Sequence, residues 1–386
     1  MPATAPISYG MFIMPFHDPV KPLGQCFDED LELIVLAEQL GFQEFWIGEH
    51  HTMQYENIVS PEIFIARALG ETSSIRLGPA PVCLNQHHPA AVASRLAFLD
   101  HLSKGRLNLC FGSGSVTADL ELYGVDPRNN SRMVNESIEM IRSLWTSDPP
   151  YELEGEFWNI RLVDNVDLET RIGFVHKPLQ TPHPPIAIPA MSRNSPSMRM
   201  AGAAGYQPFG HCLVTGNVLK DFWDTYELGA AETGRTANRG DYKVARSIFL
   251  ADTTQEAEAL ARNNSLGHNY EYIGRLFDKG LGRKIYKREL DMPDADCNLD
   301  FLMTEQIIAG DVDTALDRLL QLWEEVGGFG TLVLMSYDWD DKSSWVRSME
   351  LFASESVSYT HLRAHETESY LVCPLLREKK IRGGGG

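Results

Sequence analysis

The run ISYGMFIM at Ile7–Met14, the segment Asp28–Leu40 and the run FQEFWIG at Phe42–Gly48 decide the fold of this chain. The two apolar runs are short enough to be buried strands. Between them, apolar residues recur at the spacing of a helix, and Gly41 follows as a helix stop. A strand, a helix and a second strand in this order predict a βαβ unit with parallel strands.

The same alternation continues along the chain. Further strands are predicted at Ile75–Leu84, Arg106–Gly112, Pro185–Ala190, Gly205–Gly210, Val244–Ala251 and Thr331–Ser336. Further helices are predicted at Pro61–Leu69, Pro89–Leu102, Ser131–Trp145, Pro196–Ala204, Asn217–Glu232, Thr254–Asn263, Asp311–Val326 and Ser343–Ser354. Eight strands separated by helices favour a single α/β domain folded as a (β/α)8 (TIM) barrel.

Two insertions interrupt the alternation. Tyr151–Val163 has strand composition around Gly155, which predicts an inserted hairpin. Leu266–Thr304 is long, polar and irregular, which is typical of a lid. We therefore predict one barrel domain over residues 1–355, with insertions at about 148–184 and 264–305.

Residues 356–386 differ from the rest of the chain. They hold five Lys or Arg against three Glu, lack sustained apolar periodicity and end in four glycines. The string SYTHLRAHET at Ser358–Thr367 also resembles the in-frame translation of a sequencing adapter. We treat this segment as a non-native or disordered tail and leave it out of the fold prediction.

The composition is that of a globular protein, with 43% hydrophobic residues among 386. The 34 Lys and Arg against 53 Asp and Glu give a net charge of −19, which argues against nucleic acid or an anionic membrane as a partner. No apolar run approaches the length of a transmembrane helix, and the first residues lack a signal-peptide pattern. Six scattered cysteines without a CxxC motif favour free thiols, so we expect a cytoplasmic protein.

Polar strings follow several predicted strands, at the end of a barrel where active sites lie. They are Glu49-His50-His51, His87-His88, Gly112–Ser115 and Ser192–Ser197. The last string precedes a helix, so its hydroxyls and the free backbone N–H groups either bind a phosphate or cap the helix. Gly112–Ser115 either admits a ligand to the backbone or forms an ordinary turn.

The string Glu49-His50-His51 is the most unusual of these. It suits acid–base chemistry near neutral pH or, together with His87 and His88, metal binding. Adjacent side chains of an extended chain point to opposite faces, so we do not expect His50 and His51 to share one metal ion. We predict no metal site.

Ala80-Pro81 lies inside a predicted strand, where proline is disfavoured. A cis bond or a bulge beside a ligand explains its presence. A trans proline at the end of the strand also explains it and is the more common state of X–Pro bonds.

At these positions the chain resembles the bacterial-luciferase-like flavin monooxygenases, over residues 7–355. The strings that carry the resemblance are FWIGEHH (Phe45–His51), RLGPAPV (Arg76–Val82), LDHLSKGR (Leu99–Arg106) and NNSR (Asn129–Arg132). The resemblance implies a TIM barrel that receives reduced FMN from a separate NAD(P)H:flavin reductase. It also implies that O₂ is activated as a C4a-(hydro)peroxyflavin.

The resemblance assigns roles to particular residues. The family's catalytic histidine falls on His50, beside Glu49, and its unusual cis peptide, which backs the isoalloxazine ring, falls on Ala80-Pro81. Its phosphate-binding positions fall on Arg132 and on the stretch from Arg193 to Ser197. The predicted cofactor-binding residues are Ala80, Pro81, Ser113, Ser115, Arg132, Ser192, Arg193, Asn194, Ser195 and Ser197.

The chain departs from the family pattern in three places. Bacterial luciferase has Cys-Arg where this chain has Gly112-Ser113, so one phosphate contact is lost and light emission is not implied. We expect Ser113 or Ser115 to replace that contact in part. Arg193-Asn194 stands in place of Glu-Ser, which restores a positive charge, and Leu266–Thr304 has no counterpart, so the substrate is unconstrained.

We therefore expect a two-component FMNH₂-dependent monooxygenase that inserts one oxygen atom of O₂ into a small apolar organic substrate. A terpene, an aldehyde or an alkane-like compound would fit. Four apolar residues near the strand ends either pack against the flavin ring and the substrate or, for at least half of them, belong to the ordinary core of the barrel: Phe12, Trp46, Met191 and Phe209. The resemblance also implies a homodimer, formed through the helices Pro61–Leu69 and Pro89–Leu102.

Three alternatives stay open. Coenzyme F420 in place of FMN would make the same fold a hydride-transfer enzyme, and the absorbance of the bound cofactor would reveal it. A metal-dependent TIM-barrel hydrolase built on Glu49–His51 and His87-His88 would contain stoichiometric metal and no flavin. A non-catalytic flavin-binding protein would bind flavin without substrate-linked oxygen consumption.

Overall fold

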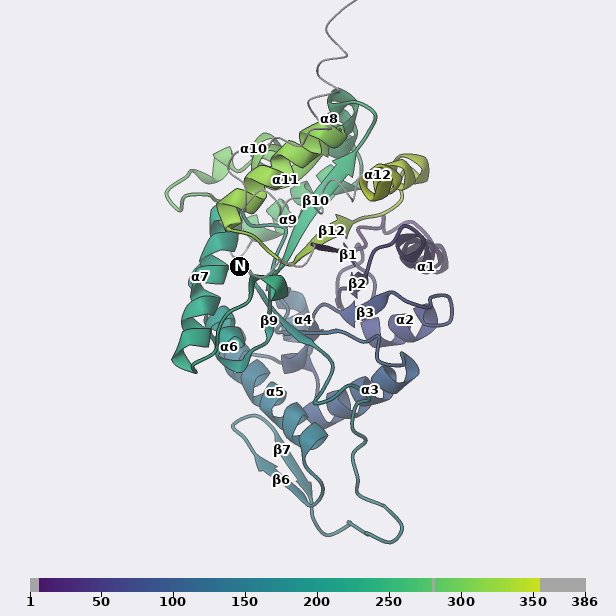
Figure 1. Cartoon of the computed structure of the whole chain (residues 1–386), viewed down its shortest axis with the longest axis vertical. Helices are drawn as coiled ribbons and strands as arrows, with labels where there is room; N and C mark the ends of the chain where they lie inside the picture. The colour runs from purple at the N-terminus through teal and green to yellow at the C-terminus, as the bar shows by residue number, and fades with distance from the viewer. Residues whose placement is uncertain (1–6, 280–281, 355–386) are drawn as a thin grey trace, which may run out of the picture.

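The computed structural model describes residues 7–279 and 282–354, and its centre is a barrel of parallel strands (Figure 1). Within these ranges the barrel strands are β1 (Ser8–Ile13), β2 (Glu44–Ile47), β3 (Arg76–Pro79) with β4 (Val82–Cys83), β5 (Leu109–Gly112), β8 (Ile186–Ala190), β9 (Gln207–Gly210), β10 (Lys243–Leu250) and β12 (Thr331–Ser336). They pair in the order β3-β2-β1-β12-β10-β9-β8-β5-β4. Because β3 and β4 are halves of one strand interrupted at Ala80-Pro81, and Leu77 also pairs with Leu107, this order closes into the predicted eight-stranded barrel.

Helices lie around the outside of the strands (Figure 1). They are α1 (Leu23–Gln39), α2 (Pro61–Ala68), α3 (Pro89–Leu102), α4 (Thr117–Leu122), α5 (Asn130–Thr146), α6 (Pro196–Ala204), α7 (Gly216–Glu232), α8 (Thr254–Asn263), α9 (Ser265–Asp278), α10 (Leu299–Glu305), α11 (Val312–Val326) and α12 (Lys342–Ser354). Local sequence sets several of their ends. Asp311 accepts a hydrogen bond from the backbone N–H of Thr314 at the start of α11, and Gly327 ends that helix with a φ of +77°.

The strands are buried on both faces, as expected for a parallel sheet covered by helices. At their N-terminal ends, Glu44 and Lys243 form a buried ion pair in which Lys243 Nζ lies 3.0 and 2.7 Å from the two carboxylate oxygens. Trp46 Nε1 donates to the same carboxylate at 2.8 Å, and Asn108 Nδ2 at 3.4 Å. We call Glu44, Lys243, Trp46 and Asn108 the bottom cluster.

The two predicted insertions differ in outcome. The hairpin expected at Tyr151–Val163 is present as β6 (Tyr151–Glu154), paired antiparallel with β7 (Asn159–Leu162), and it extends away from the barrel near α5 (Figure 1). The prediction that Leu266–Thr304 is irregular is wrong, because most of this segment belongs to α9 and α10 or to short 3-10 turns.

Polar residues and glycines hid the helical period of this second insertion. The buried residues of α9 nevertheless recur at helical spacing and include Leu266, Tyr270, Ile273 and Phe277. The segment ends in β11 (Ile307–Gly310), a strand that sequence analysis missed. This strand pairs with β10 outside the closed order of the barrel.

The tail at residues 356–386 lies outside the described residues, so the domain boundary at 355 stays a prediction. Among the described helices, none is both long and apolar enough to cross a membrane.

Candidate active site

A cavity of about 510 Å³ opens at the carboxyl ends of the barrel strands. Residues that follow β2, β5, β8 and β9 line it, together with residues of α9. Most of the lining is apolar, and it includes Phe12, Met191, Phe209, Ile273, Leu276 and Phe277. Trp46, which was expected here, lies instead in the bottom cluster. The volume and lining are those of a small-molecule site.

His50 lies just beyond β2 and lines this cavity. Its Nδ1 is 3.3 Å from Asp119 Oδ2, and its Nε2 is 3.2 Å from Glu56 Oε2. Burial alone lowers the pKa of His50, but the charges of Glu56 and Asp119 and the hydrogen bonds to them outweigh burial and raise this pKa to about 10. His50 is therefore an imidazolium at neutral pH. We call His50, Glu56 and Asp119 the top cluster.

Asp119 comes from α4, a helix that sequence analysis did not predict. Its Oδ1 accepts hydrogen bonds from the backbone N–H groups of His51 and Thr52, at 3.2 and 2.7 Å. It also accepts from the Thr52 hydroxyl at 2.6 Å. One carboxylate thus fixes the backbone after β2 and orients the ring of His50.

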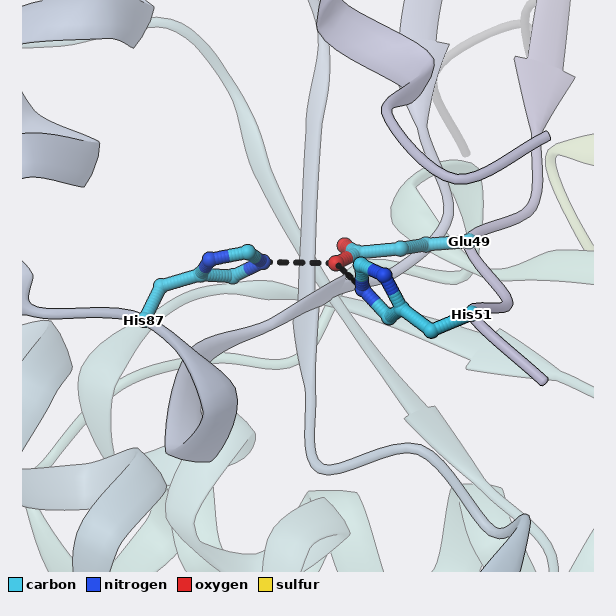
Figure 2. Close-up of side chains that lie close together, drawn as sticks. All are labelled: Glu49, His51 and His87. Atoms are coloured by element: carbon cyan, nitrogen blue, oxygen red, sulfur yellow. Dashed lines mark hydrogen bonds and ion pairs between the residues drawn. The ribbon is translucent and has the colours of Figure 1, made fainter. Parts of the chain in front are cut away.

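Glu49 lies between His51 and His87 and pairs with both (Figure 2). Glu49 Oε1 is 3.0 Å from His51 Nε2 and 2.6 Å from His87 Nε2, and Oε2 accepts the backbone N–H of Cys83 at 3.1 Å. Burial raises the pKa of Glu49, but the hydrogen bonds from His51, His87 and Cys83 outweigh it and lower this pKa to about 2. Glu49 is an anion that ties the end of β2 to β4.

The Glu49, His51 and His87 side chains also have the composition of a metal site, with ligand atoms within 4.8 Å of one another. His50 contacts a different pair of carboxylates, in agreement with the expectation that it does not share an ion with His51. His88 belongs to the metal alternative, but its side chain accepts the Ala90 N–H at 3.2 Å and caps α3. The absence of a resident metal stays a prediction.

Ala80-Pro81 is a cis peptide, as the resemblance implies, and both residues line the cavity. Gly112 of β5 faces this dipeptide. A Cβ atom at Gly112 would lie 3.0 Å from Pro81 Cβ and Cγ, which is tighter than ordinary packing. Glycine therefore lets β5 approach the proline ring closely at this wall of the cavity.

The predicted cofactor-binding serines all line the cavity: Ser113, Ser115, Ser192, Ser195 and Ser197. Two of them stand at the start of α6, where Ser195 Oγ and Ser197 Oγ are 2.8 Å apart. The Ser195 side chain makes no capping hydrogen bond to this helix. That this string binds an anion at the start of α6 stays a prediction.

The other polar residues predicted to bind the cofactor do not line the cavity. Arg132 pairs with Glu156 of the inserted hairpin, and its Nη2 donates to Asn129 at 2.6 Å. Arg193 Nη2 donates to the carbonyl of Arg288 at 2.5 Å. The backbone N–H of Asn194 donates to Asp221 at 2.7 Å. Three of the ten predicted residues thus make their contacts elsewhere.

Sequence analysis also missed four residues of the site: Glu56, Asp119, His211 and Lys279. Glu56 lies in the loop before α2. Its role depends on the ion pair with His50, which no local sequence pattern predicts. Lys279, just after α9, is the one Lys or Arg that lines the cavity among the described residues. His211 follows β9 directly, so the rule that identified the other strand ends would have found it.

An apolar cavity at the carboxyl ends of a (β/α)8 barrel, with a charged histidine and a cis-proline wall, defines an α/β-barrel enzyme. The chain belongs to the luciferase-like monooxygenase family, whose profile matches residues 7–328. It is 34% identical to 4-hydroxyprotoasukamycin monooxygenase of Streptomyces nodosus subsp. asukaensis over 353 residues, which is 90% of each chain. The predicted family and monooxygenase class are thereby confirmed.

Solved structures show the same relationship. The oxygenating constituent of 3,6-diketocamphane monooxygenase from Pseudomonas putida, in complex with FMN, matches with a TM-score of 0.82 and 29% identity. That match covers 91% of this chain and 98% of the other. An F420-dependent secondary alcohol dehydrogenase matches with a TM-score of 0.67 and 18% identity, covering 91% of this chain and 98% of its own, and so shares the fold alone.

Proposed function

We propose that this protein is the oxygenase component of a two-component monooxygenase. It takes reduced FMN from a separate NAD(P)H:flavin reductase and inserts one oxygen atom of O₂ into a small apolar organic substrate. The observation that carries the proposal is the charged His50 at the edge of an apolar cavity in this family's barrel. The likeness to an oxygenating constituent solved with FMN supports FMN over F420.

The cavity fits the two parts of FMN. The apolar Ala80-Pro81 dipeptide in its lining suits a flavin ring, and the hydroxyl groups at the start of α6 suit a phosphate. Lys279 adds a positive charge to the lining. A phosphate contact from Arg132 requires this side chain to leave Glu156. Reduced FMN supplies the two electrons that activate O₂.

The protein's own residues control water and protons. Apolar side chains of the strand ends and of α9 keep water away from the reacting atoms. At neutral pH His50 holds a proton on each ring nitrogen. It is therefore able to donate a hydrogen bond or a proton to an oxygen atom that gains negative charge during the reaction. Glu56 and Asp119 keep its ring in position.

Anaerobic reduction of FMN with the protein present, followed by admission of O₂, tests the proposal. His50→Ala is expected to slow substrate oxygenation by about 100-fold or more, since a positioned proton donor contributes at least that much, while FMN still binds. His268→Ala is the matched control, because His268 is exposed on α9 and does not line the cavity.

Two results would contradict the proposal. A wild-type protein that binds no FMN would refute it and direct attention to F420. Unchanged oxygenation in His50→Ala would remove the assigned role of that histidine.

We also propose a homodimer formed through α2 and α3, which contact each other. Their outer surfaces carry exposed apolar side chains: Ile63 at 74%, Phe98 at 62% and Leu102 at 47% exposure. Such a patch is typical of a protein interface. Light scattering is expected to give the mass of a dimer, and that of a monomer for Phe98→Asp; a monomeric wild-type protein would contradict this assignment.

We further place the protein in the cytoplasm. Its five described cysteines are free thiols, and all of them are buried, which supports a reducing compartment.

A further inference from the structure

His211 is a polar side chain of the cavity that the proposed function leaves without a role. It follows β9 directly. In the closed eight-stranded order, β9 lies four strands from β2 in either direction. His211 therefore lines the cavity from the wall opposite His50.

The hydrogen bonds around His211 fix its tautomer. The backbone N–H of Leu213 donates to His211 Nδ1 at 3.2 Å, so Nδ1 is an acceptor and the ring proton of the neutral form sits on Nε2. Within residues 7–279 and 282–354, no group accepts a hydrogen bond from Nε2. This N–H is therefore available to a ligand.

Burial and a neighbouring buried arginine keep this histidine neutral. Arg246 is 1% exposed and donates to the carbonyls of Cys212 and Val214, at 3.2 and 2.7 Å, directly beyond His211 in the chain. Burial and the positive charge of Arg246 lower the pKa of His211 to about 4. The two cavity histidines thus differ at neutral pH, since His50 is charged and His211 is a neutral donor.

The surroundings of His211 make this donor selective. The neighbouring lining residues are apolar, among them Phe209, Ala245 and Met335. A ligand that covers Nε2–H without accepting its hydrogen bond leaves a polar group buried and unpaired, which weakens binding. A ligand with an acceptor at this point suffers no such loss.

We propose that the substrate carries an acceptor oxygen on an otherwise apolar skeleton, and that His211 Nε2–H binds this oxygen. The proposal rests on the proposed function, because it concerns the substrate of that same reaction. Among the substrates that fit an apolar cavity, it selects oxygenated compounds over plain hydrocarbons. His211 is a specificity residue in this account, and His50 keeps its separate role.

A matched pair of cage compounds tests the proposal. 2-Adamantanone and 2-methyleneadamantane have nearly the same shape, but only the ketone accepts a hydrogen bond. Calorimetric titration into the protein, with and without oxidised FMN, is expected to give about tenfold tighter binding of the ketone. His211→Leu is expected to abolish this preference. His211→Gln places an amide N–H near the same point and is expected to retain it.

The outcomes separate this inference from the proposed function. A wild-type protein without a preference for the ketone, or a preference that survives in His211→Leu, overturns the role of His211. Loss of FMN affinity in His211→Leu with the preference intact assigns the donor to the flavin and also overturns it. If FMN does not bind, the proposed function fails, yet the flavin-free titration still decides about His211. Thermal unfolding of each variant checks its fold.

Discussion

The two ends of β2 carry charged clusters that are built in opposite ways. Glu44, the first residue of the strand, belongs to the bottom cluster and accepts hydrogen bonds from Lys243, Trp46 and Asn108. His50, just beyond the last residue, belongs to the top cluster. There Glu56 Oε1 has no hydrogen-bond partner among the described residues, and the cluster borders a cavity.

The buried charges of the bottom cluster serve the structure, whereas those of the top cluster can serve chemistry. In the bottom cluster every charge has a fixed partner. The cluster therefore connects strands, and no charge is left unpaired to bind a ligand. The top cluster combines one imidazolium with two carboxylates beside open space, which leaves it able to respond to a ligand. Only the second arrangement suits catalysis.

The largest effect is expected from breaking the bottom cluster. Lys243→Met leaves the Glu44 carboxylate buried without its cation, which should lower the free energy of unfolding by about 3–5 kcal/mol. Urea denaturation followed by circular dichroism measures this loss. Activity per folded molecule should be retained, because Lys243 does not line the cavity.

A compensated variant sharpens this first prediction. Glu44→Gln combined with Lys243→Met removes both charges and should recover most of the lost stability. If the double variant is as unstable as Lys243→Met alone, the loss comes from packing against Trp46 and not from the unpaired charge.

A smaller effect is expected from Asp119→Asn in the top cluster. Asparagine retains an oxygen for the Thr52 N–H but loses the charge that faces His50, so we expect about 1–3 kcal/mol lower unfolding free energy and a lower pKa of His50. Denaturation and NMR titration of the imidazole measure the two effects. Asp148→Asn, at a site with an 81% exposed side chain, is the control and should change neither.

A change of thermal stability with pH is expected as well. The folded pKa of His50, about 10, lies above that of an unfolded histidine, so protonation stabilises the folded state. That contribution is complete below about pH 6.5 and is lost as the pH rises towards 10. The difference in Tm between wild type and His50→Gln should therefore shrink between these limits.

Other histidines do not affect this comparison of two proteins. His17 also has a raised pKa, about 9, because its hydrogen bonds to Asp30 and Asp338 outweigh its burial, but it is present in both proteins and cancels. Parallel Tm profiles across this range would show that His50 is not charged in the folded state.

Much of the fold followed from local sequence. α6, α8 and β12 have their predicted bounds, because caps, glycines and apolar runs mark their ends. His50 and Ala80-Pro81 were placed in the site because they directly follow or interrupt strands of the barrel.

The missed features depend on contacts between distant segments. α4 has only six residues, too few for a periodic signal, so Asp119 could not be matched with His50. The Arg132 side chain is oriented by its ion pair with Glu156, a residue of the inserted hairpin that lies 24 positions later in the sequence. Such pairings exist only after the chain has folded.

The position of β11 beside β10 bears on how this protein can evolve. The excursion from Ala251 to Gln306 leaves the barrel at the end of β10 and returns beside Ser247 of the same strand. Both of its junctions therefore lie on or beside the same strand, β10, and the closed order of the other strands does not pass through it. Evolution can replace or lengthen this excursion, and with it one wall of the cavity, without changing the strand order of the barrel that holds His50.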